Sequence, residues 1–552
     1  KLALRIDDRA IKAARQADAP VIYVVSHRSR LDPALMLSLL PDDTLHILDP
    51  GSSSTFWLEP WRELARTIVF KAEHVFVSRR LVRILKRKGR IAVYVPDDVE
   101  PDMRSFRLYR AISRIALQAD ARVVTIAVAG SEQFRFGRDG ETTARGRWLP
   151  RLTIGALPGR TITELVGASL GGATTGSNAL FDRVAEVRSC TAAAGLTVFT
   201  GVLQAARRYG ADREIVEDML TGEMSYRHLL IGARIFAGRF ARITAPREVV
   251  GVLLPNSNAV AITLLGLWSA GRVATPINHT AGAANVTTAI RMVAARLVVS
   301  SRVFVEKAGL QEIVTAAEAG GARFLWIEDL RAGITGFDRA VAAMLWRNAL
   351  SRQKPSMAAV VLFSSGSEGQ PKGIQLSHAN LMSNAMQVEA RLAIGPGDRV
   401  LGVLPAFHAL GLLGGIVLPL LTGVRTLLYP SPLHFRQIPK LAAKARPTVI
   451  FATDTFLSAY AKAADADDFA SLRFAVAGAE PLRRSTREIW RERFGVRLLE
   501  GYGMTEASPV VALNTATHGR DGSVGRLLPG IRGRIEAVEG ITEGGRLWIC
   551  GP

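Results

Sequence analysis

The segment Val360–His378, VVLFSSGSEGQPKGIQLSH, carries side chains that could bind a polyphosphate. Its apolar residues up to Phe363 predict a buried strand, which hydroxyl residues, glycines and a lysine follow. Glycines let backbone N–H groups approach an anion closely, hydroxyls add donors and lysine adds positive charge. The pattern is not the Gly-x-x-x-x-Gly-Lys-Ser/Thr of the Walker loop. We predict that the phosphate site comprises Ser364, Ser365, Gly366, Ser367, Gly369, Lys372 and Gly373.

The segment SSGSEGQPKG resembles the phosphate loop of the adenylate-forming superfamily, which includes acyl-CoA and acyl-carrier-protein synthetases. That resemblance implies that the loop holds the β- and γ-phosphates of ATP while a carboxylate attacks the α-phosphate. Two segments further along the chain agree with the family in order and spacing. AGAEPL resembles the wall of the adenine site and implies Gly478, Ala479 and Glu480. EGYGMTE implies Tyr502 against adenine, Thr505 on the α-phosphate and Glu506 as the magnesium ligand.

Two further considerations concern these site residues. Expulsion of pyrophosphate needs a metal and cations to neutralise the developing charge, and a glutamate oxygen suits Mg²⁺. The segment LPAFHALGL resembles the family's acyl-pocket segment and implies His408. A lone histidine in an apolar run is also often a core residue, so both interpretations of His408 stay open.

A second candidate site lies near the start of the chain, in VVSHRSRLDPALML. His27 follows a predicted buried strand, and Asp32 lies five residues further on, before Pro33. An aspartate before a proline is a frequent helix N-cap. Paired with His27, the same carboxylate would orient an imidazole that removes a proton from a hydroxyl group. Asp32 can serve as cap and as partner at once.

The His-x-x-x-x-Asp pattern resembles the first motif of the glycerolipid acyltransferases. With the adenylate-forming half after it, the chain resembles a family of bacterial bifunctional proteins. These join an acyl-acyl-carrier-protein synthetase to a 2-acylglycerophosphoethanolamine acyltransferase. The resemblance implies activation of a fatty acid with ATP and Mg²⁺, loading onto acyl carrier protein, and transfer to a lysophospholipid. It also implies a location at the cytoplasmic side of the bacterial inner membrane.

One block departs from the acyltransferase pattern. Such proteins carry a Pro-Glu-Gly-x-Arg-like block that binds the acceptor's phosphate, whereas Pro96–Pro101 here reads PDDVEP. Its carboxylates would repel a phosphate. Arg104 or Arg107 would have to replace the missing arginine. This departure leaves open whether the first half is an active acyltransferase.

The order of elements predicts two α/β domains. Strand patterns in APVIYVVSH, RIAVYVP and ARVVTIAVAG alternate with helical ones, and similar patterns recur after Cys190. We expect a glycerolipid acyltransferase-like domain over 1–162, a linker over 163–189, and the large part of an adenylate-forming domain over 190–552. The resemblance implies that the small C-terminal domain of that fold is absent and would lie beyond Pro552. In open α/β sheets, ligands bind beyond the carboxyl ends of the strands.

Composition limits the partners. A hydrophobic content of 48% excludes a disordered chain, and two cysteines exclude a disulfide scaffold. The formal net charge is +21, which predicts an acidic partner. The densest basic run, Ser78–Arg90, places Leu81, Ile84 and Leu85 on one helical face. It suits a solvated helix, anionic lipid headgroups or acidic acyl carrier protein; without interleaved aromatics we expect no nucleic acid.

Two apolar stretches, Val249–Gly271 and Leu401–Gly423, each predict a strand, a turn and a buried helix rather than a membrane span. Two alternative functions stay open. One is a long-chain acyl-CoA ligase with a degenerate acyltransferase module. The other is the cytoplasmic part of a protein fused to a lysophospholipid transporter, because the sequence begins without a methionine.

Overall fold

The chain forms two compact units in the computed structural model. The first unit comprises Lys1–Ala194, Ala390–Ala393 and Leu527–Pro552, and the second comprises Gly195–Glu389 and Ile394–Arg526. The structure describes residues 4–6, 20–27, 29, 31–48, 67–69, 75–96, 106–133, 151–168, 174–365, 371–516 and 519–552.

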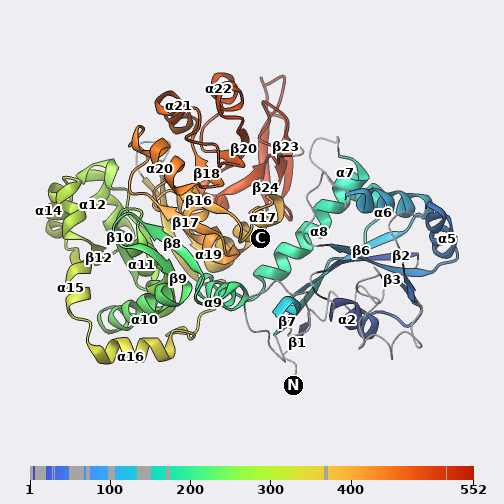
Figure 1. Ribbon diagram of the computed structural model, residues 1–552, viewed down its shortest axis with the longest axis horizontal. Coiled ribbons are helices and arrows are strands. Elements are labelled where there is room, and N and C mark those ends of the chain that lie inside the picture. Colours follow the sequence, from blue (N-terminus) through green and yellow to red (C-terminus); the bar gives the residue numbers. More distant parts are fainter. Residues whose placement is uncertain are drawn as a thin grey trace. The chain divides into compact units, whose positions relative to one another are not determined.

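The first unit is built on a seven-stranded sheet in the order β1-β7-β6-β2-β5-β3-β4 (Figure 1, blue to teal). Its strands are β1 (Leu4–Ile6), β2 (Val21–His27), β3 (Thr44–Leu48), β4 (Thr67–Val69), β5 (Arg90–Pro96), β6 (Arg122–Ala129) and β7 (Leu152–Ala156). The three strands predicted from the sequence are β2, β5 and β6, and they are adjacent and parallel. Strand β7 pairs antiparallel with β6.

Helices cover both faces of this sheet. Figure 1 shows α2 (Leu31–Leu39) on one side, and α6 (Phe106–Ala119) and α8 (Gly176–Ala193) on the other. Alternate residues of a strand point to opposite faces. Tyr23 and Val25 therefore pack on the side of α2, whereas Ile22 and Val24 pack on the side of α6 and α8. The latter core also includes α5 (Val75–Lys86), with Leu81 and Leu85 buried and Ile84 packed against them, as the sequence predicted.

The expected linker over 163–189 holds helices in its described part. Helix α7 (Ile162–Gly167) begins with a capping box between Thr161 and Glu164. Thr175 caps the first turn of α8, and the ring of Phe181 lies 5.4 Å from that of Tyr109, centroid to centroid. The small, weakly charged residues here suggested a connector; they allow close helix packing instead. The first unit therefore extends to Ala194.

The second unit has two sheets (Figure 1, green to orange). One has the order β13-β12-β10-β11-β14-β15. Its strands are β10 (Val249–Leu253), β11 (Val273–Pro276), β12 (Leu297–Ser300), β13 (Arg323–Trp326), β14 (Ala358–Ser365) and β15 (Pro371–Ser377). The other runs β21-β20-β19-β18-β16-β17-β8-β9. Its strands are β8 (Glu214–Asp218), β9 (Gly222–Ser225), β16 (Arg399–Gly402), β17 (Arg425–Leu428), β18 (Val449–Ala452), β19 (Phe474–Ala477), β20 (Arg497–Gly503) and β21 (Val510–Leu513).

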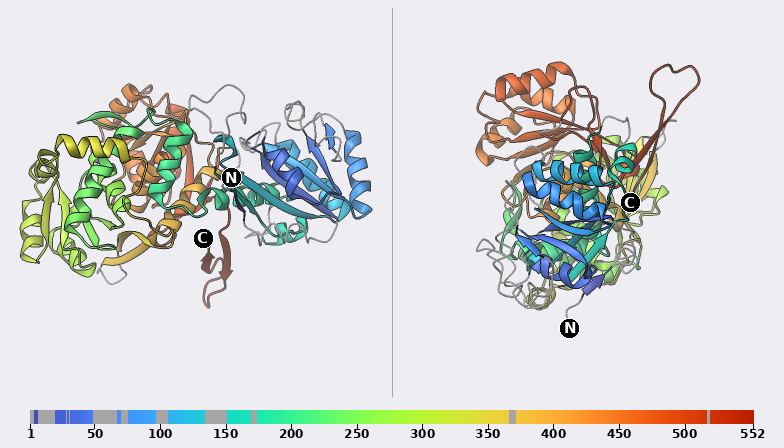
Figure 2. Two further views of the ribbon diagram at one scale, coloured as in Figure 1. Left: turned by 90° about the horizontal axis from the view of Figure 1, so that it is seen from below. Right: turned by 90° about the vertical axis from the view of Figure 1, so that its right-hand side faces the viewer.

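Buried helices pack on these sheets. They include α9 (Val198–Tyr209), α10 (Tyr226–Ile243), α11 (Asn258–Ala270), α17 (His378–Arg391), α21 (Asp454–Ala463) and α22 (Arg484–Phe494). Trp490 of α22 is fully buried and donates a hydrogen bond to the Leu457 carbonyl at 3.0 Å. Because β18, β19 and β20 are parallel neighbours, their carboxyl ends meet at one edge of the sheet. A further two-stranded ribbon, β23 (Arg532–Glu536) and β24 (Arg546–Cys550), is the dark red hairpin of Figure 2.

The two apolar stretches fold as predicted. Val249–Gly271 forms β10 and α11, and Leu401–Gly423 forms the end of β16 and a helical run from Ala409 to Thr422. Among the described residues, no single helix has the length and hydropathy of a membrane span; one helix pair, α8 with α9, reaches both when taken together.

Phe181→Ala tests whether α8 belongs to the core of the first unit. The loss of a buried ring should cost about 3–5 kcal/mol. Hydrogen–deuterium exchange of the β2, β5 and β6 amides should report this loss, while amides of the second unit keep their protection. Leu117→Ala is the matched control, because Leu117 is 54% exposed on α6. Unchanged protection of the three strands in Phe181→Ala would show that α8 packs loosely.

Candidate functional site

The predicted phosphate segment forms the tip of a β-hairpin. Strands β14 and β15 pair antiparallel, with Ser364 opposite Lys372 and Phe363 opposite Gly373. Directly opposed residues point to the same face, so Ser364 and Lys372 share one side of the ribbon. The strand continues to Ser365, two residues beyond the predicted end, and Lys372 and Gly373 lie in β15 rather than in a loop. Gly366, Ser367 and Gly369 lie outside the described residues.

The adenine segment follows β19. Gly478 is buried, and a side chain there would meet Leu410 at 3.4 Å. Ala479 has a left-handed φ of +68°, a strained conformation for alanine that is typical of functional turns. The Glu480 carboxylate accepts hydrogen bonds from the backbone N–H of Thr455 at 3.0 Å and from its hydroxyl at 2.7 Å. Glu480 therefore ties this turn to the start of α21.

The segment from Tyr502 to Glu506 turns sharply after β20. A side chain at Gly503 would lie 2.2 Å from the Pro509 carbonyl oxygen, so only glycine fits. The Met504 N–H donates to that same carbonyl at 2.9 Å, which closes the turn. Thr505–Ala507 form one 3-10 turn that packs against β14 and β15. This contact brings Thr505 and Glu506 to the hairpin that carries Ser364 and Lys372.

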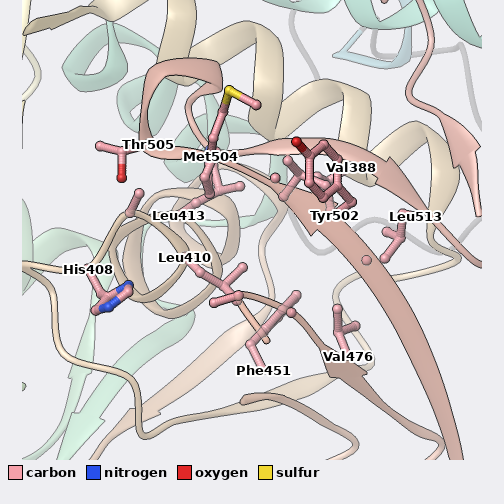
Figure 3. Close-up of a pocket in the computed structure, with 17 residues that line it drawn as sticks. Val388, His408, Leu410, Leu413, Phe451, Val476, Tyr502, Met504, Thr505 and Leu513 are labelled. Carbon is pink, nitrogen blue, oxygen red and sulfur yellow. The ribbon is translucent and has the colours of Figure 1, made fainter. Parts of the chain in front are cut away.

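A pocket of about 180 Å³ opens at these strand ends (Figure 3). It is larger than a water-sized void. Five of the predicted residues line it: His408, Gly478, Ala479, Tyr502 and Thr505. In Figure 3, His408 and Tyr502 stand on opposite sides, with the side chain of Leu410 between them. Aliphatic and aromatic side chains, including Phe451 and Val476, form the rest of the wall, which suits an apolar group with polar ends.

The loop that carries His408 is held by a residue that the sequence analysis missed. Asn256 is buried; its amide donates to the carbonyl of Leu404 at 2.7 Å and accepts from the Ala406 N–H at 3.0 Å. The signal was present in LLPNSN, where a polar residue follows a buried strand. His408 reaches solvent at the pocket, and desolvation by the surrounding chain lowers its pKa. The ring is therefore neutral at pH 7.

Glu506 suits a metal that phosphates help to bind. Its side chain is exposed beside the hairpin. Within the described ranges, no group of three or more His, Cys, Asp or Glu residues could hold a metal ion. Mg²⁺ is usually bound through one or two carboxylates together with substrate phosphates and water. One carboxylate beside a phosphate-binding hairpin fits this mode.

The first unit brings His27 and Asp32 together. The His27 Nδ1 atom lies 3.6 Å from Oδ2 of Asp32, which is fully buried. Asp32 is not the N-cap: α2 begins at Leu31, and the Asp32 carboxylate accepts the Ser29 N–H at 2.9 Å. The Ser29 hydroxyl accepts the Leu31 N–H at 3.2 Å and so takes the capping role. The carboxylate thus points inward, toward the sheet.

Two further polar residues, absent from the predictions, adjoin this pair. Tyr94 on β5 lies edge-on to His27, with ring centroids 6.1 Å apart. Its hydroxyl is 2.9 Å from Nδ1 of His46 on β3. Burial lowers the pKa of His46 to about 4, and burial with the Asp32 charge raises that of Tyr94. Polar residues inside the apolar strands TLHIL and RIAVYVP were the available signal.

The predicted acceptor residues are not brought to His27. Arg107 is exposed on α6, on the sheet face opposite α2. Arg104 and the acidic block after Pro96 lie outside the described residues.

Comparison with known proteins agrees with the second unit. The AMP-binding enzyme family matches residues 202–552. A probable 4-coumarate–CoA ligase of Dictyostelium discoideum is 35% identical over 35% of this chain and 37% of its own length. A long-chain-fatty-acid–CoA ligase of Yersinia pestis is 32% identical over 35% of this chain and 36% of its own length. The matched region therefore spans little more than a third of these relatives.

Solved structures show the same fold. The anthranilate CoA ligase AuaEII, in complex with anthranoyl-AMP, superposes with a TM-score of 0.57 at 20% identity, over 65% of this chain and 69% of its own. ATP-bound MatB from Rhodopseudomonas palustris gives 0.55 at 23% identity, over 64% and 70%. AMP-binding enzymes use ATP and Mg²⁺, which the hairpin, the pocket and Glu506 fit. The chain belongs to the AMP-binding enzyme family and resembles its acyl- and aryl-CoA ligases.

Proposed function

We propose that this protein activates a fatty acid with ATP to an acyl-adenylate, loads the acyl group onto acyl carrier protein, and transfers it to a lysophospholipid. The observation that carries the first step is the shared location of the pocket and the hairpin. Tyr502, Gly478 and Ala479 line the pocket, and the Thr505–Ala507 turn joins it to the strands that bear Ser364 and Lys372.

Each part of this site has a role in adenylation. Adenine packs against Tyr502 and the Gly478–Ala479 backbone, which approaches closely because Gly478 has no side chain. The Thr505 hydroxyl donates to the α-phosphate that the carboxylate attacks, and Lys372 and the hairpin hydroxyls neutralise the departing pyrophosphate. Glu506 would hold Mg²⁺, which supplies positive charge between the phosphates. The apolar wall around Leu410 and Phe451 accepts the start of the acyl chain.

The second step needs a thiol. Acyl carrier protein is an acidic partner, which suits a chain with a formal net charge of +21. Coenzyme A is the alternative acceptor, because the named relatives are CoA ligases. The alternative function is therefore a long-chain acyl-CoA ligase, with a first unit that does not transfer acyl groups.

The third step belongs to the first unit. His27 removes the proton from the lysophospholipid hydroxyl, whose oxygen then attacks the thioester carbonyl; the thiol leaves as the new ester forms. Asp32 stabilises the imidazolium that results. The 3.6 Å separation from a buried carboxylate supports this role. Because the acceptor is a lipid, we propose that the protein works at the cytoplasmic face of the bacterial inner membrane, and a fusion to a lysophospholipid transporter would be consistent with that place.

Thr505→Ala and Glu506→Gln test the adenylation site. Each variant of the full-length protein should lose about 10²–10³-fold in fatty-acid-dependent exchange of labelled pyrophosphate into ATP, because each loses a group that stabilises phosphate charge. Glu543→Gln, on the exposed turn between β23 and β24, is the matched control. Wild-type rates in both site variants would contradict the assignment of this turn.

His27→Ala tests acyl transfer separately. With labelled palmitate, ATP, Mg²⁺, acyl carrier protein and lysophosphatidylethanolamine, the variant should load the carrier normally. Its transfer of label to phospholipid should fall by about 10²–10⁴-fold, the usual loss of a general base. Asp32→Asn should lower transfer as well. If the wild-type protein labels only the carrier, or labels coenzyme A in preference to it, the ligase alternative holds.

A further inference from the structure

Two helices of the first unit present a continuous basic surface. On α5, the side chains of Arg79, Arg80, Arg83 and Lys86 are exposed, opposite the buried Leu81 and Leu85. On α6, which packs beside α5, Arg107, Arg110 and Arg114 are exposed. We call these seven side chains the two-helix basic face. Both helices pack their apolar sides into the same core, so their basic sides face outward together.

The charge of this face is unbalanced. Neither α5 nor α6 contains an acidic residue. None of the seven side chains forms an ion pair with another residue in the described part of the chain. Elsewhere the exposed arginines are often paired, as Arg302 is with Asp329 at 2.6 Å. Seven cations of one sign, with no partner supplied by the fold, favour an anionic partner from outside.

An apolar residue lies among these cations. Leu117 is 54% exposed, three residues after Arg114 and seven after Arg110, so all three occupy one side of α6. An apolar side chain among arginines suits the boundary between lipid headgroups and acyl chains. It does not suit nucleic acid, which would need aromatic side chains for stacking, and Phe106 and Tyr109 are buried.

We infer that the two-helix basic face binds an anionic lipid surface, with Leu117 inserted at the headgroup boundary. A run of four to eight Lys or Arg residues on an amphipathic helix is typical of binding to anionic lipid. The inference rests on the proposed function only in that the acyl acceptor is a membrane lipid. Vesicle binding reports it without catalysis, so failure of either claim is distinguishable from failure of the other.

The test compares two variants of equal net charge. The first carries Arg80→Glu, Arg83→Glu, Arg110→Glu and Arg114→Glu on the face. The control carries Arg291→Glu, Arg296→Glu, Arg323→Glu and Arg497→Glu on the second unit, where these side chains are exposed. Sedimentation with vesicles of phosphatidylcholine and phosphatidylglycerol should show binding at least about tenfold weaker for the first variant and near wild-type binding for the control.

Further arms decide the remaining outcomes. Leu117→Ser keeps every charge and should also weaken binding to the anionic vesicles. Vesicles of phosphatidylcholine alone should bind little of any variant. Equal loss in both quadruple variants would mean that net charge alone acts, and would overturn the inference. Unchanged vesicle binding with lost binding to acyl carrier protein would assign the face to an acidic protein instead. Circular dichroism and pyrophosphate exchange confirm that each variant is folded.

Discussion

The contact between the Thr505–Ala507 turn and the β14–β15 hairpin is what joins the parts of the nucleotide site. Strand β20 ends at Gly503, where a side chain would collide with the Pro509 carbonyl oxygen at 2.2 Å. The Met504 N–H bonds to that carbonyl and closes the turn at 2.9 Å. Because the chain reverses here, Tyr502 stays at the pocket while Thr505 and Glu506 reach the phosphate hairpin. A longer connection would separate base recognition from phosphate recognition.

Local patterns predicted much of this arrangement. Short apolar runs that end in glycine or polar residues marked β18, β19 and β20, and parallel pairing then placed their ends at one edge. Five predicted residues line one pocket for this reason. The exact end of β14 could not be predicted, because ladder pairing with β15 extends the strand into residues whose own propensities favour a loop. Asn256 was missed because its three backbone partners are far away in sequence.

The first unit illustrates the same limit. The His27–Asp32 pair followed from its spacing, yet the capping role fell to Ser29, since the burial of Asp32 turns its carboxylate inward. His46 and Tyr94 lie on strands that are distant along the chain and meet only through the order β2-β5-β3. Helix α8 was taken for a linker because its small residues resemble a connector until the sheet that they cover is known. Tertiary packing, not local propensity, decides each of these features.

The measurement that tests the central claim most directly is a crystal structure of the protein with AMP. The account predicts adenine in the pocket between the Tyr502 ring and the Gly478–Ala479 backbone, with the phosphate beside Thr505 and directed toward Ser364 and Lys372. AMP bound elsewhere, or adenine at the hairpin with the pocket empty, would contradict it. Titration calorimetry of the Tyr502→Ala variant should then show weaker AMP binding, because base stacking contributes about 1–3 kcal/mol.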